Sequence, residues 1–237
     1  MKTERCATIA QFRGKIIMHP RLNEVIEDLR TFSRTLTDVG DYPKVILICG
    51  PAGVGKTTAL KVEERAILES SAAEADNPAY LPSVEISVSK EAEACTTWKQ
   101  FWAEGYEKSL IGKKPWAEIE TKGLGEVSRQ NTTEDLRQAV EKRFLHRHTK
   151  FLFIDEAQHL LCWGQDPSAK KNLEFLVSLA TKFQVRCVMA GPYELKTLAS
   201  LNGSLISRVR FIHFRAYGAS KEEARRPKSQ RAGRLDR

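Results

Sequence analysis

Short apolar runs alternate with longer amphipathic stretches along the chain, and this pattern predicts strands and helices in turn. The runs predict strands over residues 44–49, 83–88, 151–154, 185–190 and about 209–214. Apolar residues at helical spacing predict helices from Pro20 onward, over 56–69, from 134 to 144, around 173–180 and around 194–200. Because strands that alternate with helices favour parallel pairing, we predict an α/β fold with a five-stranded parallel sheet and helices on both faces.

The segments between these elements are less regular. Loops are expected at 37–43, 70–82 and 165–168, and Thr132 can cap the helix that follows it. Residues 16–18 are apolar and can pack against the body of the domain. Residues 89–129 are the least regular part, yet they contain a stripe of aromatic residues at helical spacing, for which core packing is favoured over a binding surface: Trp98, Phe101, Trp102 and Tyr106.

A glycine-rich loop follows the first strand directly and fits the pattern G-x-x-x-x-G-K-[ST]. In such a loop, successive backbone N–H groups face phosphate oxygens, and the next helix adds its positive N-terminus. We therefore predict binding of ATP, with Lys56 on the β- and γ-phosphates and Thr57 on Mg²⁺. The predicted cofactor-binding residues are Gly50, Pro51, Ala52, Gly53, Val54, Gly55, Lys56, Thr57 and Thr58.

Two carboxylates end the third apolar run, at Asp155 and Glu156. A buried parallel strand delivers such groups to the carboxyl edge of its sheet, where phosphate loops also lie. The pair can also form a plain surface turn, but beside a phosphate loop a hydrolytic site is favoured. We predict that Asp155 binds Mg²⁺, directly or through water, and that Glu156 polarises the attacking water.

Composition and charge limit the classes of protein to which the chain can belong. No apolar run reaches the length of a membrane span, so we expect a cytoplasmic protein without membrane contact. The five cysteines are odd in number and lack a C-x-x-C pair, which indicates reduced thiols. The net charge is +8, and residues 215–237 hold eight Lys or Arg and only three Asp or Glu. This tail is expected to be disordered, and either to touch nucleic acid or to be simply solvated.

Together these motifs resemble those of AAA+ ATPases, with a P-loop NTPase core. Five further stretches are similar to the TniB/TnsC family, the ATP-binding regulators of DNA transposition: Ile16–Arg21, Asp155–Leu161, Asn172–Ala180, Gly191–Leu195 and Leu205–Arg208. The similarity runs from about Ile16 to Phe214. It implies an N-terminal segment with an amphipathic helix over 1–42, the ATPase core over 43–215 and a basic tail over 216–237.

The resemblance also implies a function. Its members oligomerise on duplex DNA as rings or helical filaments when ATP is bound, mark a target, and recruit a transposase together with target-selection proteins. Their nucleotide lies between protomers, where an arginine of the neighbour completes the catalytic site. Arg208 matches that position best, and Arg210 is the next candidate.

Two features depart from the family pattern. Pro192 stands where a hydroxyl or amide side chain normally senses the γ-phosphate after the fourth strand, and proline has no such hydrogen-bonding group. The expected C-terminal helical lid is reduced or absent, since a basic tail occupies that position. These departures predict slow hydrolysis, and they leave three alternatives: a nucleotide-gated DNA scaffold, another initiator-like or loader-like ATPase, and a P-loop kinase. A glutamate next to the magnesium ligand disfavours the kinase, because it would activate water and waste ATP.

Overall fold

The computed structural model describes residues 16–34, 45–71, 80–88, 98–110, 132–161, 167–196 and 208–216. The strands are β1 (Val45–Cys49), β2 (Ser83–Ser87), β3 (Phe151–Asp155), β4 (Arg186–Gly191) and β5 (Val209–His213). The helices are α2 (Pro20–Arg34), α3 (Lys56–Ser71), α4 (Trp98–Leu110), α6 (Thr133–His146), α7 (Gln158–Leu161) and α8 (Pro167–Phe183).

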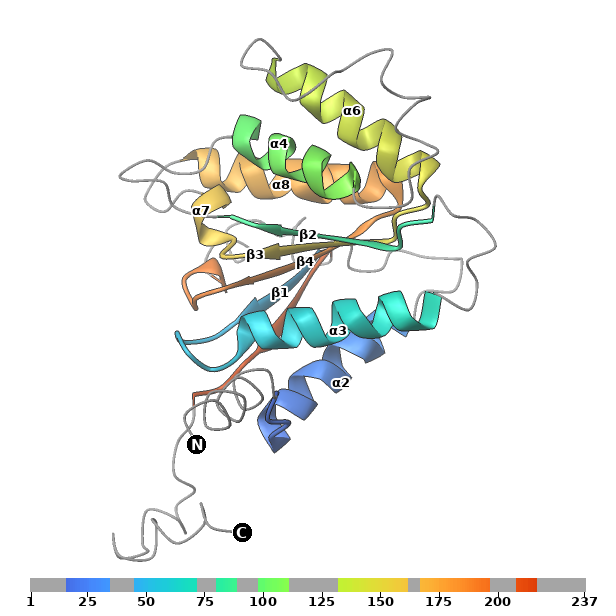
Figure 1. The fold of residues 1–237 in the computed structure, drawn as a ribbon. Coiled ribbons are helices and arrows are strands. Elements are labelled where there is room, and N and C mark those ends of the chain that lie inside the picture. Colours follow the sequence, from blue (N-terminus) through green and yellow to red (C-terminus); the bar gives the residue numbers. More distant parts are fainter. Residues whose placement is uncertain are drawn as a thin grey trace, which may run out of the picture.

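The five strands form one sheet in the order β2-β3-β4-β1-β5, and every pairing is parallel. Helices α2 and α3 cover one face, and α4, α6 and α8 cover the other (Figure 1). The predicted α/β fold with a five-stranded parallel sheet is therefore confirmed. Since β1 lies between β4 and β5, the loop that follows it is framed by the carboxyl ends of both neighbours.

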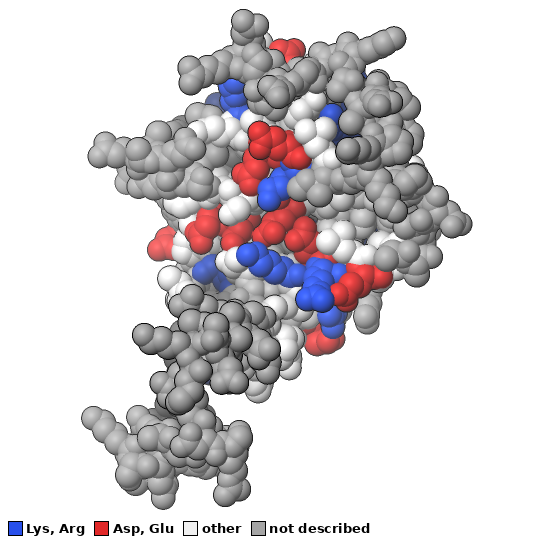
Figure 2. Space-filling view, in the orientation of Figure 1, with Lys and Arg blue, Asp and Glu red and all other residues white. Residues whose placement is uncertain are grey.

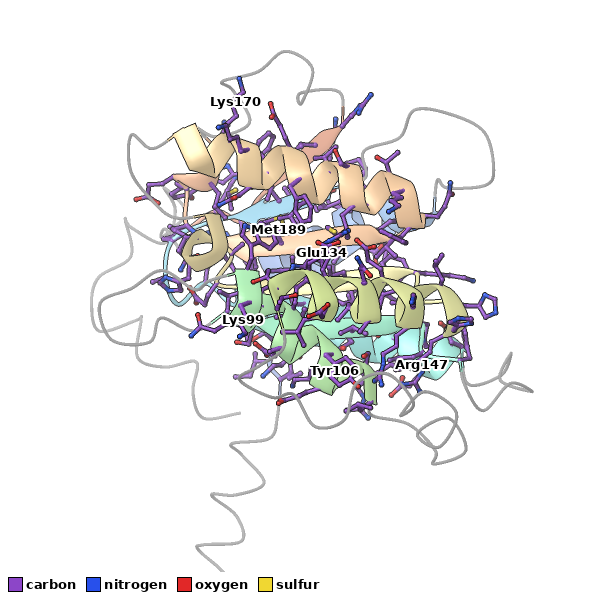
Figure 3. The ribbon with its side chains drawn as sticks, turned by 90° about the horizontal axis from the view of Figure 1, so that it is seen from above. Lys99, Tyr106, Glu134, Arg147, Lys170 and Met189 are labelled. Atoms are coloured by element: carbon purple, nitrogen blue, oxygen red, sulfur yellow. The ribbon has the colours of Figure 1, made fainter. Side chains whose placement is uncertain are left out.

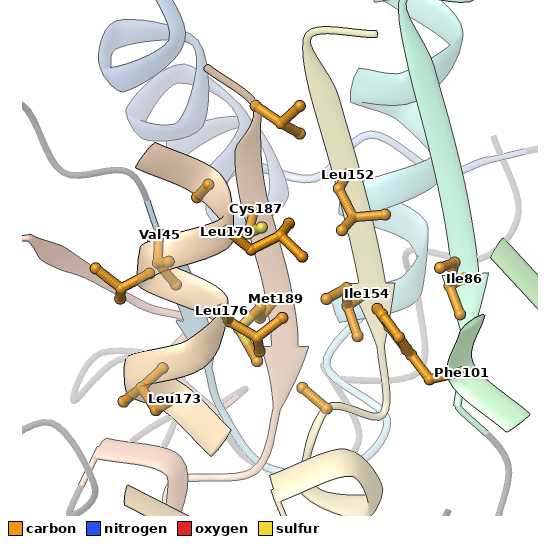
Figure 4. Close-up of a cluster of buried hydrophobic side chains, with 14 of the residues drawn as sticks. Val45, Ile86, Phe101, Leu152, Ile154, Leu173, Leu176, Leu179, Cys187 and Met189 are labelled. Atoms are coloured by element: carbon orange, nitrogen blue, oxygen red, sulfur yellow. The ribbon is translucent and has the colours of Figure 1, made fainter. Parts of the chain in front are cut away.

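Each face of the sheet has its own core, because successive side chains of a strand point to opposite faces. Val45 and Leu47 of β1 face α4, α6 and α8, whereas Ile46 and Ile48 face α2 and α3. In the first core, leucines of α8 cover β4, as Figure 4 shows for Leu176 over Met189. All five residues of β1 are buried, so the strand that precedes the phosphate loop is held on both sides.

The aromatic stripe belongs to this core, as predicted. Phe101 and Trp102 are each 1% exposed and Tyr106 is 4% exposed. Trp98 packs edge-on against Phe175 of α8, with ring centres 4.9 Å apart. Seen from above, α4, α6 and α8 form one helical layer, with Tyr106 on α4 and Met189 in the sheet below (Figure 3).

The helix over 133–146 begins as the sequence predicts. Thr132 is its N-cap and accepts a hydrogen bond from the Asp135 backbone nitrogen, while the Asp135 side chain accepts one from the Thr132 backbone. This reciprocal pair satisfies two N–H groups that the first turn of a helix leaves without partners. Glu134 and Asp135 in that turn also favour the positive end of the helix dipole.

Some expectations are corrected. Pro167 and Ser168, predicted in a loop, begin α8, because proline is favoured in the first turn, where its missing N–H costs no helical bond. Ser70 and Ser71 likewise continue α3. Ile16, Ile17 and Met18 do not pack against the body: they are 48%, 81% and 48% exposed. The boundary at 42/43, the loop at 37–43, most of the helix at 194–200, the basic tail and the lid region lie outside the described residues.

Candidate active site

The phosphate loop connects β1 to α3 by a tight turn. Gly53 and Gly55 have φ values of 76° and 101°, in the left-handed region that favours glycine. The first helical hydrogen bond follows at once, from the Ala59 nitrogen to the Gly55 oxygen at 2.9 Å. The N-terminus of α3 thus begins directly at the loop, as an anion-binding site requires.

The base of the loop is fixed by both neighbouring strands. The Gly50 nitrogen donates to the Gly191 oxygen of β4 at 3.2 Å, and the Phe214 nitrogen donates to the Cys49 oxygen at 2.8 Å. A Cβ at Gly50 would lie 2.4 Å from the Phe214 oxygen, so only glycine fits this approach. The loop therefore leaves β1 at a position set by the carboxyl ends of β4 and β5.

Lys56 points back over the loop. Its ammonium donates to the Gly50 oxygen at 3.0 Å and to the Pro51 oxygen at 2.8 Å. Phosphate oxygens placed in the loop would accept hydrogen bonds from the same ammonium. The other predicted loop residues, Ala52, Val54 and Thr58, lie in the turn and the first turn of α3, with Val54 buried at 3% exposure.

Thr57 meets Asp155 across the site. The Thr57 Oγ1 hydroxyl donates to Asp155 Oδ2 at 2.7 Å, although 98 residues separate the two in the chain. Asp155 is the last residue of β3 and is 5% exposed. A hydroxyl and a carboxylate are both ligands that suit Mg²⁺, so this pair fits the predicted metal.

Glu156 follows with an unusual backbone conformation. Its φ is 51°, uncommon for a residue with a side chain, and its nitrogen donates to Asp155 Oδ1 at 2.9 Å. The sharp turn leaves the carboxylate exposed beside Asp155, where it accepts a hydrogen bond from the Gln158 side chain. Lys56, Thr57, Asp155 and Glu156 are thus brought to one edge of the sheet.

Arg208 is not brought to this edge. Its oxygen accepts a hydrogen bond from the Val45 nitrogen at 3.3 Å, at the start of β1, whereas the phosphate loop lies at the end of β1. The length of β1 separates them by about 16 Å. Arg208 is exposed, while the guanidinium of Arg210 lies 4.6 Å from the centre of the Phe32 ring of α2. Arg208 therefore does not line the site of its own chain.

β4 ends in Gly191, and Pro192 follows, as the sequence indicates. The next residue, Tyr193, turns its hydroxyl toward β5, where it lies 2.8 Å from the His213 Nε2 atom. The two rings meet edge to face at 5.1 Å. This pair joins the ends of β4 and β5 next to the phosphate loop, a contact that sequence reasoning missed because 20 residues separate its members.

Cys49 lies just below the loop. Burial raises the pKa of its thiol to about 11, and the nearby Lys196 and Lys56 ammonium groups only partly oppose that rise. The thiol is therefore protonated near neutral pH. Cys49 and Cys187 are both free and buried, as predicted for them. Lys196 was also missed: a lysine three residues after a strand end carries no pattern of its own.

Acidic side chains gather on another face. Figure 2 shows Asp and Glu in the middle of the side that carries the edge strand β2, with Lys and Arg among them. Burial, and then the neighbouring Glu85 carboxylate, raise the pKa of Glu64 to about 7. The pKa of Glu104 is also raised, chiefly by burial. A phosphate backbone would be repelled by such a face.

Comparison with known proteins agrees with this geometry. Residues 39–198 match the family described as AAA domain. The chain belongs to this family. The match contains the phosphate loop, Asp155 and Glu156, so the AAA domain supplies the residues of the candidate site. The comparisons do not separate the TniB/TnsC branch from other AAA proteins, and a search of curated proteins gave no match.

Solved structures share the fold of this AAA domain. ORC2 of Aeropyrum pernix, solved as ADPNP–ADP complexes, has a TM-score of 0.57 at 17% identity, covering 87% of this chain and 50% of that one. ORC1 of the same organism, solved with DNA, has a TM-score of 0.54 at 17% identity, covering 86% and 47%. A Walker-type ATPase of Pyrococcus abyssi has a TM-score of 0.51 at 15% identity, covering 84% and 54%.

The chain spans about half the length of these proteins. At such low identities the similarity is one of fold. In the described part of the chain, no helix combines the length and the apolar character that crossing a membrane requires.

Proposed function

We propose that this AAA domain binds ATP with Mg²⁺ and hydrolyses it slowly. The observation that carries the proposal is the 2.7 Å contact of Thr57 Oγ1 with Asp155 Oδ2, which joins the phosphate loop to the end of β3. When bound there, Mg²⁺ would neutralise phosphate charge. Loop amides from Gly50 to Gly55 would hold the phosphates, Lys56 would bind the β- and γ-oxygens, and Glu156 would take a proton from the attacking water.

We further propose that hydrolysis needs a neighbouring protomer. Arg208 is exposed and lies at the opposite edge of the sheet from its own phosphate loop. An arginine so placed can reach a phosphate loop only in another copy of the chain. There it would stabilise negative charge that develops on the γ-phosphate.

The biological role proposed is regulation of transposition. The protein would oligomerise on duplex DNA with ATP, mark the target and recruit a transposase with its target-selection proteins, and hydrolysis would drive disassembly. Support comes from the five stretches similar to the TniB/TnsC family and from the net charge of +8. ORC1 of Aeropyrum pernix, whose fold is similar, was solved in complex with DNA. The acidic face that carries β2 would point away from the duplex.

One observation favours a second function, a nucleotide-gated DNA scaffold with little turnover. Pro192 follows β4 and offers no donor to the γ-phosphate, and the Tyr193 hydroxyl is engaged with His213. Steady-state phosphate release with and without duplex DNA separates the two functions. The regulator should turn over ATP, faster on DNA, whereas the scaffold should bind both ligands without turnover. An initiator-like or loader-like ATPase would share the site but would not bind a transposase.

Imaging of the protein with an ATP analogue and duplex DNA tests the assembly. We expect a ring or helical filament that follows the duplex, and Lys56→Ala should prevent it. Isolated monomers under the same conditions would contradict the proposal. Capture of the cognate transposase by the assembled form, and not by DNA alone, would distinguish a transposition regulator from an initiator.

A further inference from the structure

We infer that Gln158 is a positioning residue for hydrolysis, which holds the Glu156 carboxylate and supplies the polar group that the end of β4 lacks. The inference rests on the proposed ATPase function. It concerns a side chain that has no phosphate or metal role in the pattern of motifs. Its basis is a set of contacts on both sides of one amide.

On one side, the Gln158 Nε2 atom donates to Glu156 Oε2. An ionised carboxylate only accepts hydrogen bonds, so the amide nitrogen must face it. The turn that makes this contact is fixed by its backbone: the Ala157 nitrogen donates to the Ala190 oxygen of β4, and the His159 nitrogen donates to the Glu156 oxygen, both at 2.9 Å. Gln158 is therefore held at the height of the β4 terminus.

On the other side, the amide oxygen faces β4. Gln158 Oε1 is buried and accepts no hydrogen bond from the residues that the structure describes. A Cβ at Gly191 would lie 2.9 Å from this oxygen, so the glycine that ends β4 leaves room for it. A buried carbonyl without a donor is unfavourable, and this one lies beside Gly191, directly before Pro192.

These contacts close a circuit around the place of the terminal phosphate. Thr57 bonds Asp155, Asp155 bonds the Glu156 nitrogen, and Glu156 bonds Gln158. The amide of Gln158 reaches Gly191, whose oxygen accepts from Gly50 at the base of the phosphate loop. Gln158 is thus the link between the carboxylate that acts on water and the strand end that lacks a polar side chain.

The consequence concerns geometry at the reacting atoms. In hydrolysis the water oxygen bonds to the γ-phosphorus, the bond from that phosphorus to the ADP oxygen breaks, and the water proton passes to Glu156. The Glu156 carboxylate is exposed, and its long side chain has several rotamers. A donor on one oxygen selects one of them, and misplacement by about 1 Å can cost on the order of 100-fold in rate.

The test uses the full chain and the variant Gln158→Leu, which removes both amide atoms at similar volume. Steady-state hydrolysis with duplex DNA should show kcat lower by about ten- to 100-fold, with KM and ATP affinity within about twofold. Gln138→Leu is the matched control, because Gln138 lies on α6 and bonds Glu134, away from the site. Its kcat should equal that of the wild type, and thermal unfolding should show that both variants fold.

A double variant shows whether Gln158 acts through Glu156. In the Glu156→Gln background, single-turnover hydrolysis followed for hours should slow no further when Gln158→Leu is added. Independent, multiplying losses would overturn the inference, as would unchanged kcat or parallel loss of ATP binding in Gln158→Leu. A wild-type chain that binds ATP with Mg²⁺ without turnover would instead overturn the proposed ATPase function itself, and with it the role of Gln158.

Discussion

Thr57 and Asp155 are hydrogen-bonded at 2.7 Å, with the threonine hydroxyl as donor and the aspartate Oδ2 as acceptor. This contact makes one site from two motifs, because Thr57 opens α3 after the phosphate loop and Asp155 ends β3. Parallel strands deliver both to the same edge of the sheet. The chemistry expected of each motif therefore has its partner within reach.

Lys56 and Glu156 should fail in different ways. Lys56→Ala removes the ammonium that would bind phosphate oxygens and should abolish ATP binding. Glu156→Gln keeps the shape of the site but removes the group that accepts the water proton. It should bind ATP normally, lower turnover by roughly 10²–10⁴-fold and keep the ATP-bound assembly together. Equilibrium nucleotide binding and phosphate release measure both effects, and equal loss of binding in the two variants would contradict the assigned roles.

Arg208 should act on a neighbour. Arg208→Ala should bind nucleotide but hydrolyse poorly, by up to about 10³-fold, because γ-phosphate charge is then uncompensated. Mixing it with Lys56→Ala protomers, which have no working site but retain Arg208, should restore part of the turnover. Arg210→Ala serves as the control, since Arg210 packs on Phe32. If phosphate release from the mixture equals the sum of the separate variants, action in trans is excluded.

Thr57 should control the requirement for Mg²⁺. Thr57→Val keeps the shape of the residue but removes the hydroxyl that bonds Asp155. The variant should need roughly ten- to 100-fold more Mg²⁺ for half-maximal hydrolysis, because ligand and orienting hydrogen bond are both lost. Thr57→Ser retains the hydroxyl and should stay near the wild type. Titration of hydrolysis with Mg²⁺ measures the shift, and equal curves for Thr57→Val and the wild type would argue against a metal ligand.

Glu64 should make stability depend on pH. Its pKa is about 7 in the folded chain, against 4.5 as its ordinary value, so the folded state holds this proton more tightly. The associated stability is present below about pH 4.5 and is lost as pH rises through 7. Glu64→Gln carries no titratable proton and should lose less stability over that interval. Urea unfolding at a series of pH values measures this, with Glu24→Gln, on exposed α2 surface, as the control; identical pH profiles would refute it.

Local chemistry made much of the site predictable from the sequence. The phosphate loop is one contiguous stretch, and its glycines at Gly53 and Gly55 adopt the left-handed φ values that only local sterics require. The apolar runs predicted all five strands, because burial on both faces leaves a periodic mark. Asp155 and Glu156 were found for the same reason: they end such a run.

Only the tertiary structure decided which distant side chains meet. The strand order β2-β3-β4-β1-β5 places Tyr193 beside His213, puts Gly191 beside the loop, and sets Arg208 at the far edge of the sheet. Gln158 acquires its place from the same order, since the turn after β3 lies against the end of β4. Sequence specifies backbone conformation and burial through near neighbours. Strand order and register set the partners of each side chain, and these depend on packing of the whole chain.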